Sequence, residues 1–177
     1  DEEEIVKRIE DDARRIIEEV KEVLRRIRDL NERILREAEE VLKEIREINR
    51  KVLEDLRRDG LPSDEIRKAE EESEKNLREL EEIIKTVEKR SRESVEEIKE
   101  LIKRAEDLLR ELIRELRETR VDERVLKRLR DELDKLREDL ERILRRNKKL
   151  LDELRELLER SRRENEKLVE ELKRKAK

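Results

Sequence analysis

Two nine-residue stretches decide the fold of this chain: IRDLNERIL at residues 27–35 and IREINRKVL at residues 45–53. They match apolar residue to apolar residue at a spacing of 18, and Asn31 is matched by Asn49. Eighteen residues make five turns of about 3.6 residues, so side chains with this spacing share one face of an undistorted α-helix. The spacing returns near the end of the chain, at Leu133, Leu151 and Val169. The repeat therefore predicts long helices, each with one apolar stripe that is interrupted by asparagine.

The composition of the chain favours a helical protein over a disordered one. Of the 177 residues, 60% are charged, 32% are apolar and none is aromatic. High charge with few aromatic residues is typical of disorder. Here, however, the Leu, Ile and Val residues recur at the helical period, which is typical of long helices and coiled coils. The 51 basic and 55 acidic residues are closely interleaved, with a net charge of −4, so we expect no large surface of a single sign.

One break in the helical pattern is strongly marked, at the segment DGLPS of residues 59–63. Glycine suits the left-handed position just past a helix end, and Gly60 in that position would let Leu61 touch Leu56. The proline of the segment cannot continue a helix, and Ser63 is expected to cap the helix that follows. The segment therefore predicts a tight turn between two helices.

A second break is predicted at the segment TRVDER of residues 119–124, although it contains neither glycine nor proline. Asp122 is a suitable N-cap, and Val121 with Leu126 would form a hydrophobic staple across it. The apolar stripe also changes phase here. A helix that continues through the segment is the alternative.

The two breaks leave three segments of similar length, with helices expected at about 2–59, 63–118 and 122–176. Connections this short make consecutive helices antiparallel neighbours. The sequence therefore predicts an all-α fold, an antiparallel up-down-up three-helix bundle that forms a single domain over residues 1–177. Because the apolar spacing averages about 3.6 residues instead of 3.5, we expect long, nearly straight helices with little supercoil.

Asparagine and serine residues interrupt the apolar stripes, and counting from the turns places them at common heights. Residue i of the first helix lies level with about 123 − i of the second, and residue j there with about 240 − j of the third. Two polar layers follow, with members from all three helices: Asn31, Ser91, Ser94 and Asn147 in the first, and Asn49, Ser73, Asn76 and Asn165 in the second. Ser161 would extend the second layer.

Two interpretations of these layers compete. A ligand or ion site is one, but Asn and Ser offer neutral oxygens and amides, without the carboxylates, imidazoles or thiolates that hold most metals. The other is a hydrogen-bond network that sets the alignment of the helices, because an unsatisfied buried polar group costs about 1–3 kcal/mol. We favour the second, and predict no catalytic, cofactor-binding or metal-binding role for any residue.

Other functions lack the residues that they need. The chain has no His, no Cys and a single Gly, so we expect no activated nucleophile, no di-iron site, no phosphate-binding loop and no enzyme. Nucleic-acid and membrane partners are not expected, because aromatic side chains to stack on bases or to anchor a membrane-surface helix are missing. No apolar run exceeds two residues, so neither a transmembrane helix nor a signal peptide is expected, and we predict a soluble protein.

The chain resembles de novo designed helical bundles in its Glu, Lys and Arg surfaces, its Leu, Ile and Val cores and its layered Asn and Ser. The 18-residue repeat is similar to that of untwisted three-helix bundles that carry hydrogen-bond layers. The resemblance implies a thermostable, monomeric scaffold with no natural substrate, compartment or required partner. The alternative is a designed interaction or switch protein, whose polar layers weaken a helix–helix interface so that it opens, swaps or forms a homo-oligomer. A spectrin-like tether is disfavoured because aromatic core residues are missing.

Overall fold

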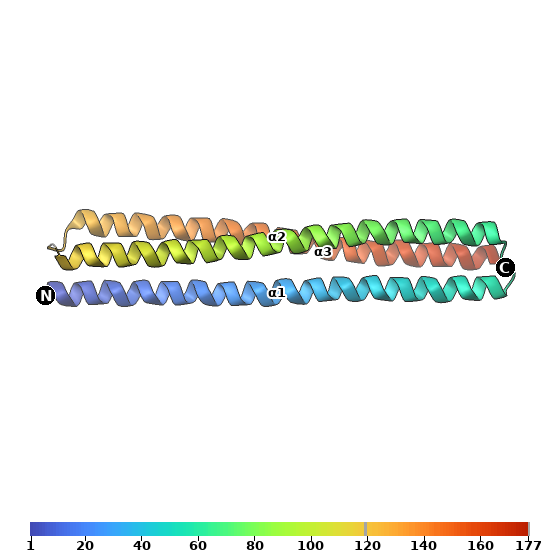
Figure 1. Ribbon diagram of the computed structural model, residues 1–177, viewed down its shortest axis with the longest axis horizontal. Helices are drawn as coiled ribbons and strands as arrows, with labels where there is room; N and C mark the ends of the chain where they lie inside the picture. The colour runs from blue at the N-terminus through green and yellow to red at the C-terminus, as the bar shows by residue number, and fades with distance from the viewer. Residues whose placement is uncertain (119, 177) are drawn as a thin grey trace. The chain divides into compact units, whose positions relative to one another are not determined.

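A computed structural model describes residues 1–118 and 120–176 of the chain (Figure 1). Three long helices account for nearly all of them: α1 (Glu2–Arg58), α2 (Ser63–Glu118) and α3 (Glu123–Ala176). No strand occurs among these residues. The protein is an all-α three-helix bundle, as the apolar repeat predicted.

The chain divides into two compact units, and each contains a part of every helix. Unit 1 comprises Asp1–Leu30 and Ser91–Lys148, and unit 2 comprises Asn31–Arg90 and Lys149–Lys177. In each unit, the three helical parts share one hydrophobic core. The predictions of a single domain and of straight helices concern how the two units are placed relative to each other, and they stay predictions.

Aliphatic side chains from all three helices form the core of unit 1. The cluster includes Ala13 and Ile17 of α1, the fully buried Ile98 and Leu112 of α2, and Ile143 of α3. Each of these residues lies on the apolar stripe of its helix, so a single face of the helix is buried. Removal of this apolar surface from water is the main term that holds the unit together.

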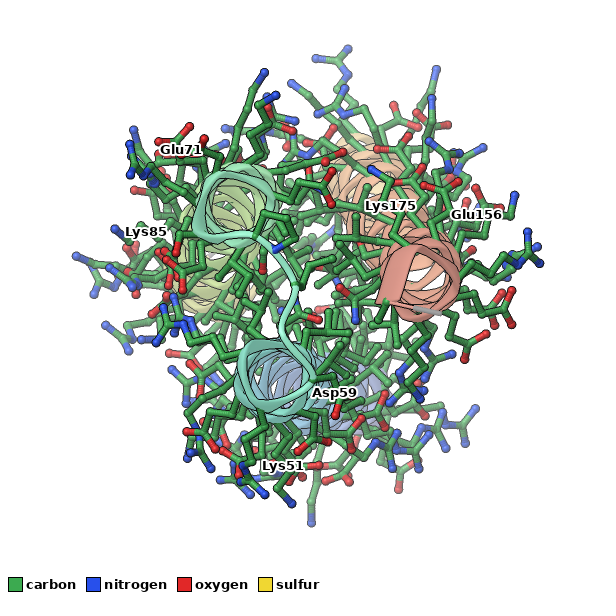
Figure 2. The ribbon with its side chains drawn as sticks, turned by 90° about the vertical axis from the view of Figure 1, so that its right-hand side faces the viewer. Lys51, Asp59, Glu71, Lys85, Glu156 and Lys175 are labelled. Atoms are coloured by element: carbon green, nitrogen blue, oxygen red, sulfur yellow. The ribbon has the colours of Figure 1, made fainter. Side chains whose placement is uncertain are left out.

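One hydrophobic cluster in the core of unit 2 lies next to the turn between α1 and α2, and it includes Leu61 of the turn and Leu172 of α3. Figure 2 views the protein from the end that carries this turn. Around the three helices, the charged side chains of Lys51, Lys85 and Glu156 are exposed and point away from the core. The strong separation of charged and apolar faces leaves the core without an ionised group among the described residues.

The turn after α1 has the predicted left-handed glycine. Gly60 has a φ angle of 88°. The N–H of Leu61 donates to the carbonyl of Leu56 at 3.0 Å, and the N–H of Gly60 donates to the carbonyl of Arg57 at 3.2 Å. These are the two hydrogen bonds of a Schellman motif. Leu56 and Leu61 both lie in the core of unit 2, so the apolar pair that accompanies the motif is buried.

Helix α2 begins at Ser63, as expected, but its N-cap differs from the prediction by one residue. The carbonyl of Pro62 accepts hydrogen bonds from the N–H groups of Glu65 and Ile66, both at 3.1 Å. Pro62 therefore occupies the N-cap position, and Ser63 is the first residue of the helix. The prediction that Ser63 caps α2 is wrong, because the fixed φ angle of proline lets the chain enter the helix one residue earlier.

The start of α3 has the predicted cap. Val121 and Asp122 are not helical, which rules out the alternative of a helix that runs through this segment. Asp122 Oδ1 accepts a hydrogen bond from the N–H of Arg124 at 3.0 Å, and the Asp122 carbonyl accepts one from the N–H of Leu126 at 3.1 Å. Val121 and Leu126 both pack against the core of unit 1. Thr119, the first residue of the predicted break, lies outside the described residues.

Ion pairs between α1 and α2 reveal the antiparallel alignment of these helices within each unit. The pairs are Glu10–Arg117 (2.8 Å) and Lys21–Glu106 (3.1 Å) in unit 1, and Arg57–Glu70 (2.7 Å) and Arg46–Glu81 in unit 2. The residue numbers of each pair add up to 127, as they must for antiparallel helices with a constant register. Sequence reasoning missed these pairs, although opposite charges at complementary positions were a readable signal. Pairs this exposed contribute little stability, so their effect is on alignment.

Replacing Gly60 tests the turn. An added Cβ would have no heavy atom within 4 Å, so Gly60→Ala introduces backbone strain without a clash. We expect Gly60→Ala to lower the free energy of unfolding by about 1 kcal/mol in chemical denaturation, and Gly60→Asn, which tolerates a positive φ, to cost less. Equal stability of the alanine variant and the parent chain would contradict this assignment.

Lys21 provides a pH-dependent test of the alignment in unit 1. The hydrogen bond to Glu106 and the attraction of its charge raise the pKa of Lys21 above 10.5. Because the pKa is raised on folding, the pair stabilises the protein below pH 10.5, and its contribution disappears as the pH rises through the folded-state pKa. In an NMR titration, Glu106→Gln should lower the pKa of Lys21 more than the control Glu18→Gln does. A larger effect of the Glu18 variant would contradict the pairing of Lys21 with Glu106 of α2.

Candidate functional site

Buried polar side chains within the apolar core are the candidate functional site. The buried polar residues are Asn31, Asn49, Ser73, Ser91, Ser94 and Asn147. Every one of them belongs to the two layers that the sequence predicted. Each helix places these residues on its apolar stripe, so the same rotation that buries leucine and isoleucine also buries an amide or a hydroxyl group.

A hydrogen bond between α1 and α2 is the centre of the second layer. Asn49 follows Ile45 on the stripe of α1, and Ser73 precedes Leu77 on the stripe of α2; Asn49 and Ser73 are 7% and 6% exposed. Asn49 Nδ2 donates to Ser73 Oγ at 2.6 Å. The residue numbers add up to 122, and counting from the turn predicted about 123. Both residues belong to unit 2, so this contact lies within a single compact unit.

The Asn49 amide has its hydrogen-bond partner at the Nδ2 group. Its Oδ1 atom is buried and has no hydrogen-bond partner among the residues that the structure describes. Leaving a buried acceptor without a partner costs about 1–3 kcal/mol, whereas a neutral hydrogen bond contributes about 1 kcal/mol. On this comparison, Asn49 makes no large net contribution to stability.

The α3 members of the second layer lie at the edge of the core of unit 2. Ser161 and Asn165 are half-buried. Together with Ser73 and Asn76 they line a cavity of about 110 Å³. Apolar side chains complete its walls, among them Leu80. The structure thus brings the α2 and α3 members of this layer to one cavity, and Ser73 faces both that cavity and Asn49.

Asn76 departs from the prediction. We expected a buried member of the layer, but its side chain is exposed. Ser73 and Leu77 already occupy consecutive buried positions of the stripe, one helical turn apart. Residue 76 is rotated by about 100° from residue 77, which places it on the border of the stripe. Asn76 therefore lies at the solvent side of the cavity.

The first layer is divided between the two units. Ser91, Ser94 and Asn147 belong to unit 1, and Asn31 belongs to unit 2. All four are buried, with exposed fractions of 5% or less, and none of them lacks an interaction partner. A meeting of Asn31 with the other three stays a prediction.

Charged groups near the second layer lie on the outer face of α1. Glu47 accepts a hydrogen bond from Arg50 at 2.7 Å. This hydrogen bond and the attraction between the two charges lower the pKa of Glu47 and raise that of Arg50. Both side chains are exposed and face away from Asn49. The amide and hydroxyl groups of the layer do not titrate at ordinary pH, so the contact between Asn49 and Ser73 does not depend on pH.

The chemistry available elsewhere is limited. Within residues 1–118 and 120–176, no group of three or more acidic residues is arranged to hold a metal ion. None of the described helices has a stretch that is both apolar enough and long enough to cross a lipid bilayer. We find no match to this chain among models of protein families, curated proteins or solved structures.

The hydrogen bond between Asn49 and Ser73 makes a double-mutant test possible. Ser73→Ala removes the acceptor and leaves the Asn49 amide buried, so we expect a loss of about 1–3 kcal/mol in the free energy of unfolding. The double variant Asn49→Leu/Ser73→Ala removes both groups and should be about as stable as the parent chain, or more stable. Additive effects of the two single substitutions would contradict the contact. Ser161→Ala, at the half-buried edge, is the matched control and should change stability by less.

Proposed function

We propose that this chain is a structural scaffold of the de novo designed kind, in which buried Asn and Ser residues specify how three helices align. It acts as a monomer, catalyses no reaction and requires no cofactor or partner. Apolar layers supply the stability, and the polar layers supply the uniqueness of the arrangement. The proposal is supported most directly by the hydrogen bond between Asn49 and Ser73 inside an aliphatic core.

The physical basis of the specification is an energy difference between alignments. Leu, Ile and Val are similar enough that a helix displaced by one turn, about 5.4 Å, could still pack apolar against apolar. Displacement of α1 by one turn would move Asn49 from Ser73 toward Ala69 or Leu77. The amide would then be buried without a partner, at a cost of about 1–3 kcal/mol. The aligned form is favoured because the alternatives are penalised.

Other parts of the chain favour the same proposal. Local signals mark the starts of α1 and α3, since Asp1 and Asp122 each accept a hydrogen bond from a backbone N–H two residues later. The left-handed Gly60 marks the end of α1. Acidic residues occupy the first turn of every helix and basic residues the last, which complements the helix dipoles. Such agreement of local and tertiary signals is what a sequence composed for one structure requires.

A conformational switch is the second candidate. Two observations favour it: the Oδ1 atom of Asn49 is buried without a hydrogen-bond partner in the described chain, and Val121 and Asp122 connect α2 to α3 without glycine or proline. A core weakened by polar groups loses less when it opens, because amides and hydroxyls are solvated well. In this candidate, α3 separates from the other helices or is exchanged between two chains.

Solution mass distinguishes the two candidates. The scaffold proposal predicts a mass of one chain, 21.9 kDa, by size-exclusion chromatography with light scattering over a wide range of concentrations. It also predicts that Asn49→Leu/Ser73→Ala stays helical but yields additional multi-chain species or broadened NMR signals, since misaligned forms are no longer penalised. A sharp, monomeric double variant would contradict specification by the layer.

A substitution in the connection between α2 and α3 provides a complementary experiment. Arg120→Gly loosens the junction between α2 and α3, with Arg120→Ala as the matched control. A scaffold keeps the same mass and scattering profile in both variants. A shift to two chains, or to a longer particle, with the glycine variant would favour the switch.

A further inference from the structure

A cavity of about 190 Å³ lies between the three helices of unit 1, far along the chain from the Asn49–Ser73 contact. Its walls are aliphatic, and they include Val20 of α1, Ala105 of α2 and Leu136 of α3. The proposed scaffold function does not use this space. Close packing normally leaves few voids larger than a water molecule in a protein core, so a space of this size requires a cause.

A small residue on the stripe of α2 contributes to this space. Ala105 is 8% exposed, and its neighbours on the same stripe are Leu101, Ile102 and Leu109. Where those neighbours extend a branched side chain into the core, Ala105 extends one methyl group. The space next to this methyl group is also lined by Val20 of α1 and Leu136 of α3.

The cavity opens toward the boundary between α1 and α3. Val20, Leu133 and Leu136 are half-buried, whereas Leu101 and Ile102 of α2 are buried and form its floor. Glu44 and Arg162 form an ion pair at 3.2 Å between α1 and α3 in unit 2. Among the described residues of unit 1, no ion pair joins these two helices. This side of the cavity is therefore its more exposed side.

Two charged residues lie at the mouth of the cavity. Glu19 of α1 and Arg137 of α3 belong to its lining, and both are exposed. Long charged side chains keep their ends in water while their stems cover apolar surface. The interior therefore offers apolar contacts and no hydrogen-bond partner, which disfavours water and charged ligands.

We infer that this cavity is a binding site for small neutral hydrocarbons of about the size of benzene. A cavity of about 150 Å³ lined by aliphatic and aromatic side chains stays free of water and binds benzene or xenon. The cavity here is slightly larger, and its interior is lined by aliphatic side chains alone, with one side open, so benzene would bury apolar surface there. The inference is independent of the proposed role of Asn49 and Ser73.

Benzene titration tests the site in the full chain. In methyl NMR spectra, benzene should shift the signals of Val20 and Leu136 in a saturable manner, and it should raise the melting temperature. Ala105→Leu fills the space and should weaken benzene binding by about tenfold or more. Ala69→Leu makes the same substitution at a buried alanine of unit 2 and should leave the shifts of Val20 and Leu136 unchanged.

Two results would overturn the inference: no saturable shift at Val20 and Leu136 in the parent chain, or equal benzene affinity in the Ala105→Leu variant. Should Ala105→Leu fail to fold, the site is decided by Leu136→Ala, which enlarges the cavity. This variant should retain binding and also accept a larger hydrocarbon such as naphthalene, which the parent chain binds more weakly. Failure of the benzene titration would leave the hydrogen bond between Asn49 and Ser73 unaffected, and loss of that hydrogen bond would leave the cavity unaffected.

Discussion

Desolvation of an amide inside an aliphatic core is the constraint on which this structure depends. Asn49 is buried on the apolar stripe of α1, and Ser73 supplies the acceptor for its Nδ2 group. The bond adds little to stability because water would satisfy the same groups in the unfolded chain. In the proposed scaffold, its importance lies in the arrangements that it excludes, so stability and specificity come from different residues.

The helix ends could be predicted from the sequence because capping chemistry is local. The Schellman motif at Gly60 needs a residue that adopts a positive φ, and the cap at Asp122 needs an oxygen near the next backbone N–H groups. The N-cap of α2 was misplaced by one residue because Pro62 takes this position through its backbone carbonyl, which gives no side-chain signal in the sequence. Buried asparagines were also predictable, since an 18-residue repeat keeps Asn49 in phase with Asn31.

Features that depend on side chains from several helices at once were less predictable. Asn76 lies one position from the buried Leu77, and a periodic pattern does not define the edge of the stripe to within one residue. The cavity beside Ala105 depends on the summed volume of side chains from three helices, so one small residue carries no clear signal by itself. The buried amide of Asn49 and the cavity also differ in physical origin. Burial of the amide costs free energy of desolvation, whereas the short side chain of Ala105 makes fewer packing contacts.

Solvent exchange of the Asn49 side-chain amide is the most direct measurement of the central claim. Asn76, which is exposed on the same unit, provides an internal reference in the unmodified chain. The account predicts that the Nδ2 protons of Asn49 exchange with water much more slowly than those of Asn76. It also predicts an NMR cross-peak between these protons and the β-protons of Ser73. Equal exchange rates for the two asparagines, together with no such cross-peak, would contradict it.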